Sequence, residues 1–165
     1  INKPTGKKIN LPGGLVFSID YDKYLLGQER AILSPSPHLS GEYSLKIPGE
    51  TLLSGWRVEA SIIKREQMAE KGGDFTAYFD IDKTGDKLVV RSRQRGDRFQ
   101  PLGMSQYKKL NEFMIDAKIP RAWRQRIPVV RSPEHILWVV GWRIDDRIKV
   151  TENTSQVLCL EFKRD

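Results

Sequence analysis

Cysteine is nearly absent from this chain of 165 residues, which contains a single one, Cys159. One cysteine excludes an intrachain disulfide, so the fold must rest on a hydrophobic core, and we expect a reducing, cytoplasmic compartment. No apolar run approaches the roughly 18 residues of a membrane-spanning helix, so we expect no membrane contact. Because the chain begins with Ile1, we expect it to be part of a longer protein.

Residues that usually carry catalysis are also scarce. The two histidines, His38 and His135, are too few and too far apart for a metal site. The chain has neither a Gly-x-Ser-x-Gly turn nor a Gly-rich phosphate loop, so nucleophilic hydrolysis has no candidate. Asp80 and Asp82 would point to one side of a strand, which leaves paired-carboxylate chemistry or Mg²⁺ binding open. The structural alternative is that these two acids end the strand and contact nearby bases or turn amides.

Basic charge is abundant and unevenly distributed. The formal net charge is +7, and eleven Lys or Arg stand against three Asp or Glu between Arg91 and Arg131. All other positions together hold 17 basic and 18 acidic residues, so they are close to neutral. Such a concentration predicts a polyanion as partner. A solvated face that is basic only for solubility remains the alternative.

Most of the chain has the pattern of short strands. Residues 34–41 are rich in Pro, Ser and Gly and predict a linker between a β-rich lead-in, residues 1–40, and a main domain, residues 41–165. Alternating or β-branched runs predict strands on both sides of this linker. The expected strands are residues 7–11, 15–19, 24–26, 43–47, 55–64, 74–82, 87–93, 136–140 and 157–162.

Helical periodicity occurs only inside the basic region. Apolar residues recur at intervals of three and four after Ser105, which predicts one amphipathic helix over residues 105–118 with Ser105 as its N-cap. Pro120 is suited to open a shorter second helix over residues 121–126. The predicted fold is therefore α+β, a mostly antiparallel β sheet or sandwich with a short two-helix basic insert.

The basic residues of this insert suit phosphate groups. A guanidinium can donate two parallel hydrogen bonds to one phosphate, and lysines at a helix start would add to the helix dipole. Contacts of this type grip the backbone of a nucleic acid and do not read its bases. The candidate contacts are Arg91, Arg93, Arg95, Arg98, Lys108, Lys109, Lys118, Arg121 and Arg124.

Four tryptophans are divided between core and surface. Trp56, Trp138 and Trp142 are expected in the core, the last two because they share the parity of their strand. Trp123 lies among arginines, and both stacking on a base and packing against the core remain open for it.

Several segments resemble the C-terminal region of bacterial tRNA(Ile)-lysidine synthetases. The resemblance is strong over about residues 80–162 and loose over residues 7–27 and 47–55. The matching segments, in the same order as in the family, are residues 90–104, 108–113, 116–120, 126–130, 136–141 and 143–147.

This resemblance implies part of an ATP-dependent ligase that attaches lysine to the wobble cytidine of the tRNA-Ile with a CAU anticodon. The family's Ser-Gly-Gly-x-Asp-Ser loop is absent here, so no catalytic residue and no cofactor is expected in this chain. ATP with Mg²⁺ and the catalytic N-terminal domain would belong to the rest of the parent protein. By resemblance, this region holds the tRNA body and shares its fold with part of the phenylalanyl-tRNA synthetase beta subunit. Asp97, within the basic motif, is expected to orient an arginine.

Two other functions stay open. The chain could be a protein-interaction module that docks the catalytic domain or a second subunit, with a homodimer among the options. It could also be a free-standing enzyme for an anionic substrate, although no acid and base pair supports this. Salt dependence separates the first alternative from RNA binding, because apolar docking persists at high salt whereas phosphate contacts weaken.

Overall fold

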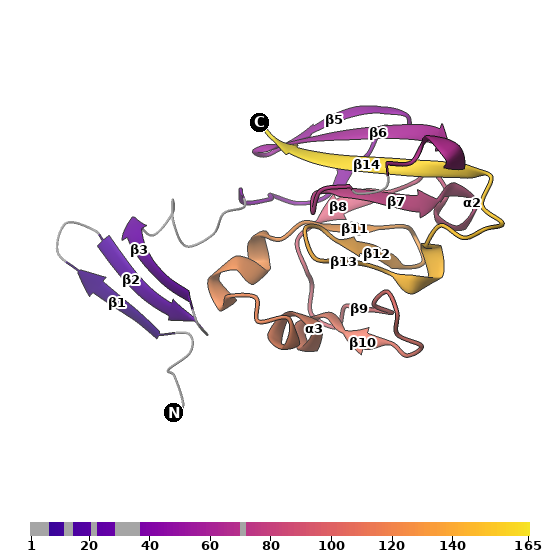
Figure 1. Ribbon diagram of the computed structural model, residues 1–165. Helices are drawn as coiled ribbons and strands as arrows, with labels where there is room; N and C mark the ends of the chain where they lie inside the picture. The colour runs from indigo at the N-terminus through magenta and orange to yellow at the C-terminus, as the bar shows by residue number, and fades with distance from the viewer. Residues whose placement is uncertain (1–6, 12–14, 21–22, 29–36, 70–71) are drawn as a thin grey trace.

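The computed structural model describes residues 7–11, 15–20, 23–28, 37–69 and 72–165, the first three segments as backbone only. Strands β1 (Lys7–Leu11), β2 (Leu15–Asp20) and β3 (Lys23–Gln28) form an antiparallel sheet in that order (Figure 1). The three strands expected near the N-terminus are thereby confirmed. The expected turn at residues 12–14 and the linker residues 34–36 lie outside the described residues, so the division at residue 40 stays a prediction.

Two antiparallel sheets build the main body (Figure 1). The four-stranded sheet has the order β5 (Gly49–Leu53), β6 (Trp56–Lys64), β14 (Gln156–Arg164) and β7 (Thr76–Asp80). The five-stranded sheet has the order β13 (Arg143–Ile144), β12 (Ile136–Val139), β11 (Val129–Arg131), β8 (Val89–Arg91) and β4 (Tyr43–Ser44). The α+β, mostly antiparallel architecture expected from the sequence is confirmed.

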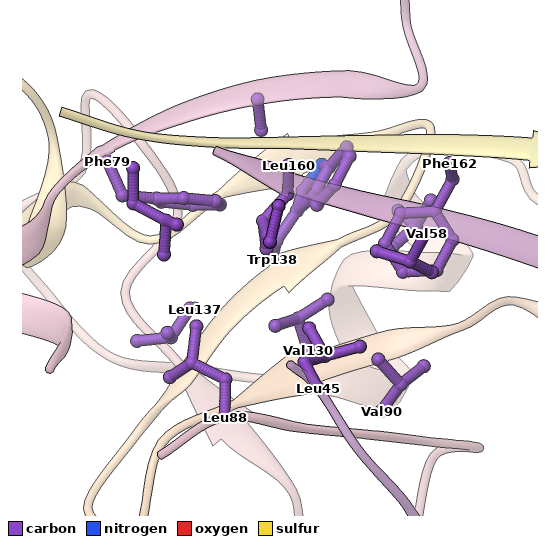
Figure 2. Close-up of a cluster of buried hydrophobic side chains, with 14 of the residues drawn as sticks. Leu45, Val58, Phe79, Leu88, Val90, Val130, Leu137, Trp138, Leu160 and Phe162 are labelled. Atoms are coloured by element: carbon purple, nitrogen blue, oxygen red, sulfur yellow. The ribbon is translucent and has the colours of Figure 1, made fainter. Parts of the chain in front are cut away.

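The first hydrophobic cluster lies between these two sheets. Alternation along β6 and β14 directs Val58, Leu160 and Phe162 inward, where they meet Trp138 from the five-stranded sheet (Figure 2). The Trp138 ring packs edge-on against Phe162, with 5.4 Å between the ring centroids. Offset and edge-on aromatic pairs of this kind add to the stabilisation by burial. The expected core positions of Trp56 and Trp138 are confirmed.

A second hydrophobic cluster covers the opposite face of the five-stranded sheet. Val129 and Val130 are consecutive and both fully buried, because one faces each cluster. The second cluster packs the sheet against helix α3 (Leu110–Asp116) through Phe113. The Phe113 ring meets the ring of Phe99 at 5.0 Å in an edge-on arrangement. This cluster is what holds the basic region against the sheet.

The helical insert differs from the sequence prediction at its start. Helix α3 begins at Leu110 and not at Ser105, because Lys108 and Lys109 form the short strand β10 (Lys108–Lys109). Strand β10 pairs with β9 (Arg98–Phe99), so the two lysines are extended and do not open a helix. The expected contribution of a helix dipole at these lysines is therefore wrong. The second helix has the predicted extent, but it is the 3₁₀ helix η3 (Arg121–Arg126).

Several strand ends also differ from the prediction. Strand β7 stops at Asp80, whose carboxylate accepts from the Asp82 amide at 3.1 Å and caps the one-turn helix α2 (Ile81–Thr84). Thr154 donates to the same carboxylate at 2.9 Å, which supports the structural interpretation of Asp80 and Asp82 as acids that end the strand.

The burial of two side chains is lower than a core position requires. Trp142 is 39% exposed, contrary to the prediction, because the chain turns at Gly141 and the strand alternation ends there. Cys159 is half-buried in β14 and is not a core residue, and burial raises the pKa of its thiol.

Two short 3₁₀ helices complete the described elements. They are η2 (Arg65–Gln67) and η4 (Asp146–Ile148). Asp145 is the N-cap of η4, and its side chain accepts from the amide of Arg147 at 2.9 Å. Asp145 and Arg147 are thereby joined within one turn.

Candidate nucleic-acid interface

A tight turn between β8 and β9 presents two arginines. In this basic turn, residues 94–98, the Asp97 amide donates to the Gln94 carbonyl at 3.2 Å, and the Gln94 amide donates to the Asp97 carboxylate at 2.7 Å. Gly96 has φ +89°, a left-handed conformation that strains any residue with a side chain. Arg95 and Arg98 flank this glycine and are exposed.

The buried Arg91 holds the basic turn in place through Asp97. Its guanidinium is 2% exposed and donates to both Asp97 carboxylate oxygens, at 2.8 and 2.9 Å. Burial opposes ionisation of Asp97, but the hydrogen bonds from Arg91 and Gln94 outweigh it and lower the pKa of this carboxyl. Asp97 therefore orients an arginine, as the sequence predicts, and Arg91 is held inside the fold.

A groove beside the basic turn collects four cationic side chains. It has a volume of about 590 Å³ and is lined by Arg93, Arg95, Arg98 and Lys109. Arg93 is fixed by Asn111 of α3, to which it donates at 2.8 Å. Residues from β9, β10, α3 and the basic turn thus form one basic groove, and we keep this name for it.

A further cation, the buried Arg124, lies close to Arg93 of the basic groove. Burial, followed by repulsion from Arg124, lowers the pKa of Arg93 below its ordinary value. Like charges close together favour the binding of an anion, because the anion relieves their repulsion. The basic groove is therefore suited to phosphate groups.

The nine candidate contacts fall into three groups. Arg93, Arg95, Arg98 and Lys109 line the basic groove. Lys118 and Arg121 are exposed outside its lining, and Lys108 forms an ion pair with Asp116. Arg91 and Arg124 are buried, and Arg124 donates to the Ile119 carbonyl at 3.0 Å. Burial makes these last two arginines supports of the interface, and we do not assign them to phosphate contact.

Sequence reasoning missed a second hollow next to the basic turn. Tyr107, Arg131, His135 and Arg147 line it together with residues 96–98. The Arg147 guanidinium donates to both carboxylate oxygens of Asp145 at 2.9 Å each, and these hydrogen bonds raise the pKa of Arg147. No spacing in the sequence signals this hollow, because its residues come from four separate segments that only the fold brings together.

Trp123, for which the sequence left both base stacking and core packing open, is half-buried and packs against the second hydrophobic cluster.

Among the described residues, no group of three or more His, Cys, Asp or Glu could hold a metal ion. In the same part of the chain, no helix has the length and apolar character needed to cross a membrane.

Comparison with known proteins identifies relatives of this chain. Residues 88–160 match the family described as the TilS substrate C-terminal domain. The tRNA(Ile)-lysidine synthase of Dehalococcoides mccartyi (strain CBDB1) is 48% identical over 99% of this chain and 35% of its own length. That of Caldanaerobacter subterraneus subsp. tengcongensis is 38% identical over 100% of this chain and 35% of its own. The chain thus spans about a third of the length of these relatives.

Solved structures show the same likeness. A crystal structure of a TilS C-terminal domain superimposes with a TM-score of 0.63 at 28% identity, covering 75% of this chain and 98% of that one. A fragment of the phenylalanyl-tRNA synthetase beta subunit from Pyrococcus horikoshii matches at 0.47 and 19% identity, over 53% of this chain and 27% of that one. The second likeness is too distant to bear on function.

The fold and the site define the class of this chain, an antiparallel α+β domain with one concentrated basic groove whose charge suits a polyanion. The matches identify the family of this domain. The chain belongs to the tRNA(Ile)-lysidine synthase family and corresponds to the C-terminal domain of its members.

Proposed function

We propose that this chain binds the sugar-phosphate backbone of tRNA through the basic groove. The observation that carries the proposal is the convergence of Arg93, Arg95, Arg98 and Lys109 on one groove of about 590 Å³. Contacts to phosphate position a nucleic acid without reading its sequence. The chain would therefore hold the tRNA while another part of the protein performs the chemistry.

The proposed parent activity is that of a tRNA(Ile)-lysidine synthase. In this proposal, a catalytic N-terminal domain uses ATP with Mg²⁺ to attach lysine to the wobble cytidine of the tRNA-Ile that carries a CAU anticodon. This chain contributes no cofactor ligand, and its partners are that tRNA and the catalytic domain. We also propose a cytoplasmic location. The similarity to curated tRNA(Ile)-lysidine synthases over the whole chain supports the parent activity.

Removal of the groove cations is the test of tRNA binding. The triple variant Arg95→Ala/Arg98→Ala/Lys109→Ala is expected to bind the CAU-anticodon tRNA-Ile about 100-fold more weakly, since each charge-assisted hydrogen bond contributes at least ~1 kcal/mol. Arg93 is left in place because its hydrogen bond to Asn111 ties it to the fold. Binding is measured by fluorescence anisotropy at low salt, with circular dichroism to verify folding.

A matched control removes three exposed cations from the four-stranded sheet. The variant Arg57→Ala/Lys64→Ala/Lys163→Ala loses the same formal charge outside the basic groove. Its surface ion pairs, such as that of Lys163 with Glu59, contribute less than about 1 kcal/mol to stability. Equal losses of affinity in the two variants would mean that net charge, and not the basic groove, governs binding.

One observation favours a second candidate function, the docking of another protein surface. Leu102 and Trp142 are 43% and 39% exposed and line one hollow, and Phe75 is 40% exposed beside Gly141. Exposed apolar side chains that gather in one place are typical of protein–protein contacts. This apolar patch could dock the catalytic domain or a second subunit while the basic groove holds tRNA.

A further inference from the structure

We propose that the second hollow receives an unpaired nucleotide of the bound RNA, with Tyr107 as the surface on which its base stacks. The inference rests on the proposed binding of RNA by the basic groove. The hollow has a volume of about 510 Å³, which is within the usual range for sites of small organic groups. We call it the Tyr107 pocket.

The Tyr107 pocket and the basic groove share one wall. Gly96, Asp97 and Arg98 of the basic turn line both. Arg98 is exposed and belongs to both linings, so one cation can contact the phosphate that joins the two sites. An RNA backbone that follows the basic groove can therefore deliver its next nucleotide into the Tyr107 pocket.

Tyr107 is held ready for stacking. Its side chain is 62% exposed, although it is a large aromatic residue. The Arg147 guanidinium lies 4.8 Å from the centre of the ring and donates to the hydroxyl at 2.9 Å. Arg147 is itself fixed by two hydrogen bonds to Asp145, a carboxylate that is fully buried. The ring is thus fixed from one side and keeps most of its surface accessible, as base-stacking aromatic residues do.

Hydrogen-bonding groups around the ring fit a nucleoside better than a bare phosphate. The Arg147 guanidinium can only donate, so the contact of 3.0 Å to His135 makes His135 Nδ1 the acceptor. The other ring nitrogen, Nε2, then carries the proton and can donate. Glu134 lines the same pocket and is exposed, so it can accept. A base edge or a ribose hydroxyl uses both this donor and this acceptor, whereas a bare phosphate would be attracted by Arg98 and Arg131 of the lining and repelled by Glu134.

The test compares two RNA hairpins that differ only in a short unpaired 3′ extension. The 165-residue chain is expected to bind the extended hairpin about tenfold more tightly than the blunt one at equal salt, the effect of one stacked base. Tyr107→Ala is expected to bind both hairpins with the affinity that the wild type has for the blunt one. Neither solution contains free nucleotide, so the difference reports the unpaired segment alone.

Two further variants show whether stacking is the cause. Tyr107→Phe keeps the ring and loses only the hydroxyl, so it should retain the preference for the extended hairpin. Leu52→Ala removes a large exposed apolar side chain outside the Tyr107 pocket and should also retain it. Equal affinities of the wild type for both hairpins, or a preserved preference in Tyr107→Ala, would overturn the inference and leave the basic groove intact. Failure of the wild type to bind either hairpin at low salt would overturn the proposed function as well.

Discussion

Asp97→Asn is expected to lower the free energy of unfolding by about 3 to 5 kcal/mol, the usual cost of removing one partner from a buried ion pair. The Arg91 guanidinium is 2% exposed and donates to both oxygens of Asp97, so the substitution removes its hydrogen-bonded counter-ion. The remaining carboxylate, that of the exposed Glu42, lies 4.0 Å from Arg91 Nε and is too distant to replace it. Asparagine has nearly the same shape, and packing around the basic turn changes little. Denaturation by urea, followed by circular dichroism, measures the loss.

The control for this prediction is Asp116→Asn. Asp116 also pairs with a cation, Lys108, but its side chain is 62% exposed, and a pair in that setting contributes at most about 1 kcal/mol. Similar losses in both variants would mean that the buried Arg91–Asp97 pair has no special weight.

The Arg91–Asp97 pair also makes the stability of the chain depend on pH. Because the pKa of Asp97 is lowered in the folded chain, its contribution to stability is present above the unfolded pKa of about 3.9 and is lost as the pH falls through the lower folded value. The stability difference between the wild type and Asp97→Asn should therefore be constant from pH 7 down to about pH 5 and shrink below about pH 4. A difference that grows on acidification would contradict this assignment.

Phe99→Ala is expected to destabilise the chain by about 3 to 5 kcal/mol, the range found when a buried phenylalanine is cut back to alanine. Phe99 is fully buried in the second hydrophobic cluster and packs edge-on against Phe113 of α3. It also follows Arg98 directly, so its loss should loosen the strand that carries one side of the basic groove.

Leu102→Ala is the matched control, since Leu102 is 43% exposed and should change stability by no more than about 0.5 kcal/mol. Urea denaturation gives both values, and hydrogen exchange reports whether protection in α3 falls first in Phe99→Ala. An effect of Phe99→Ala as small as that of Leu102→Ala would show that the second cluster does not support the interface.

The sequence predicts the elements of this fold better than it predicts their ends. Long strands such as β6 and β14 are identified, because burial of one face imposes a period of two along part of each, as at Trp56, Val58 and Ala60. The helix was expected to start at Ser105, because Tyr107 matches the helical spacing. In the fold, the extended pair Lys108 and Lys109 is fixed by strand β9, a partner that no local pattern reveals.

The sequence predicts where the basic residues are concentrated, but it does not predict which of their side chains face the surface. The concentration of basic residues is visible by counting, and four of the nine candidates do converge on the basic groove. The expected strand over residues 87–93 would place Arg91 and Arg93 on one face, but β8 ends at Arg91, so the alternation of side chains does not extend to Arg93. Arg91 points inward and donates to Asp97. The Tyr107 pocket depends on contacts between distant segments and has no signature in the sequence.

The most direct test of the account is the salt dependence of tRNA binding by the wild type and by Arg95→Ala/Arg98→Ala/Lys109→Ala. Each phosphate contact releases counter-ions, so a plot of log affinity against log salt should be steep for the wild type and shallower by about two to three units for the variant. Such a result would support a basic groove that grips the tRNA backbone. Equally weak binding by both proteins, with little dependence on salt, would contradict it and favour a docking role for the apolar patch.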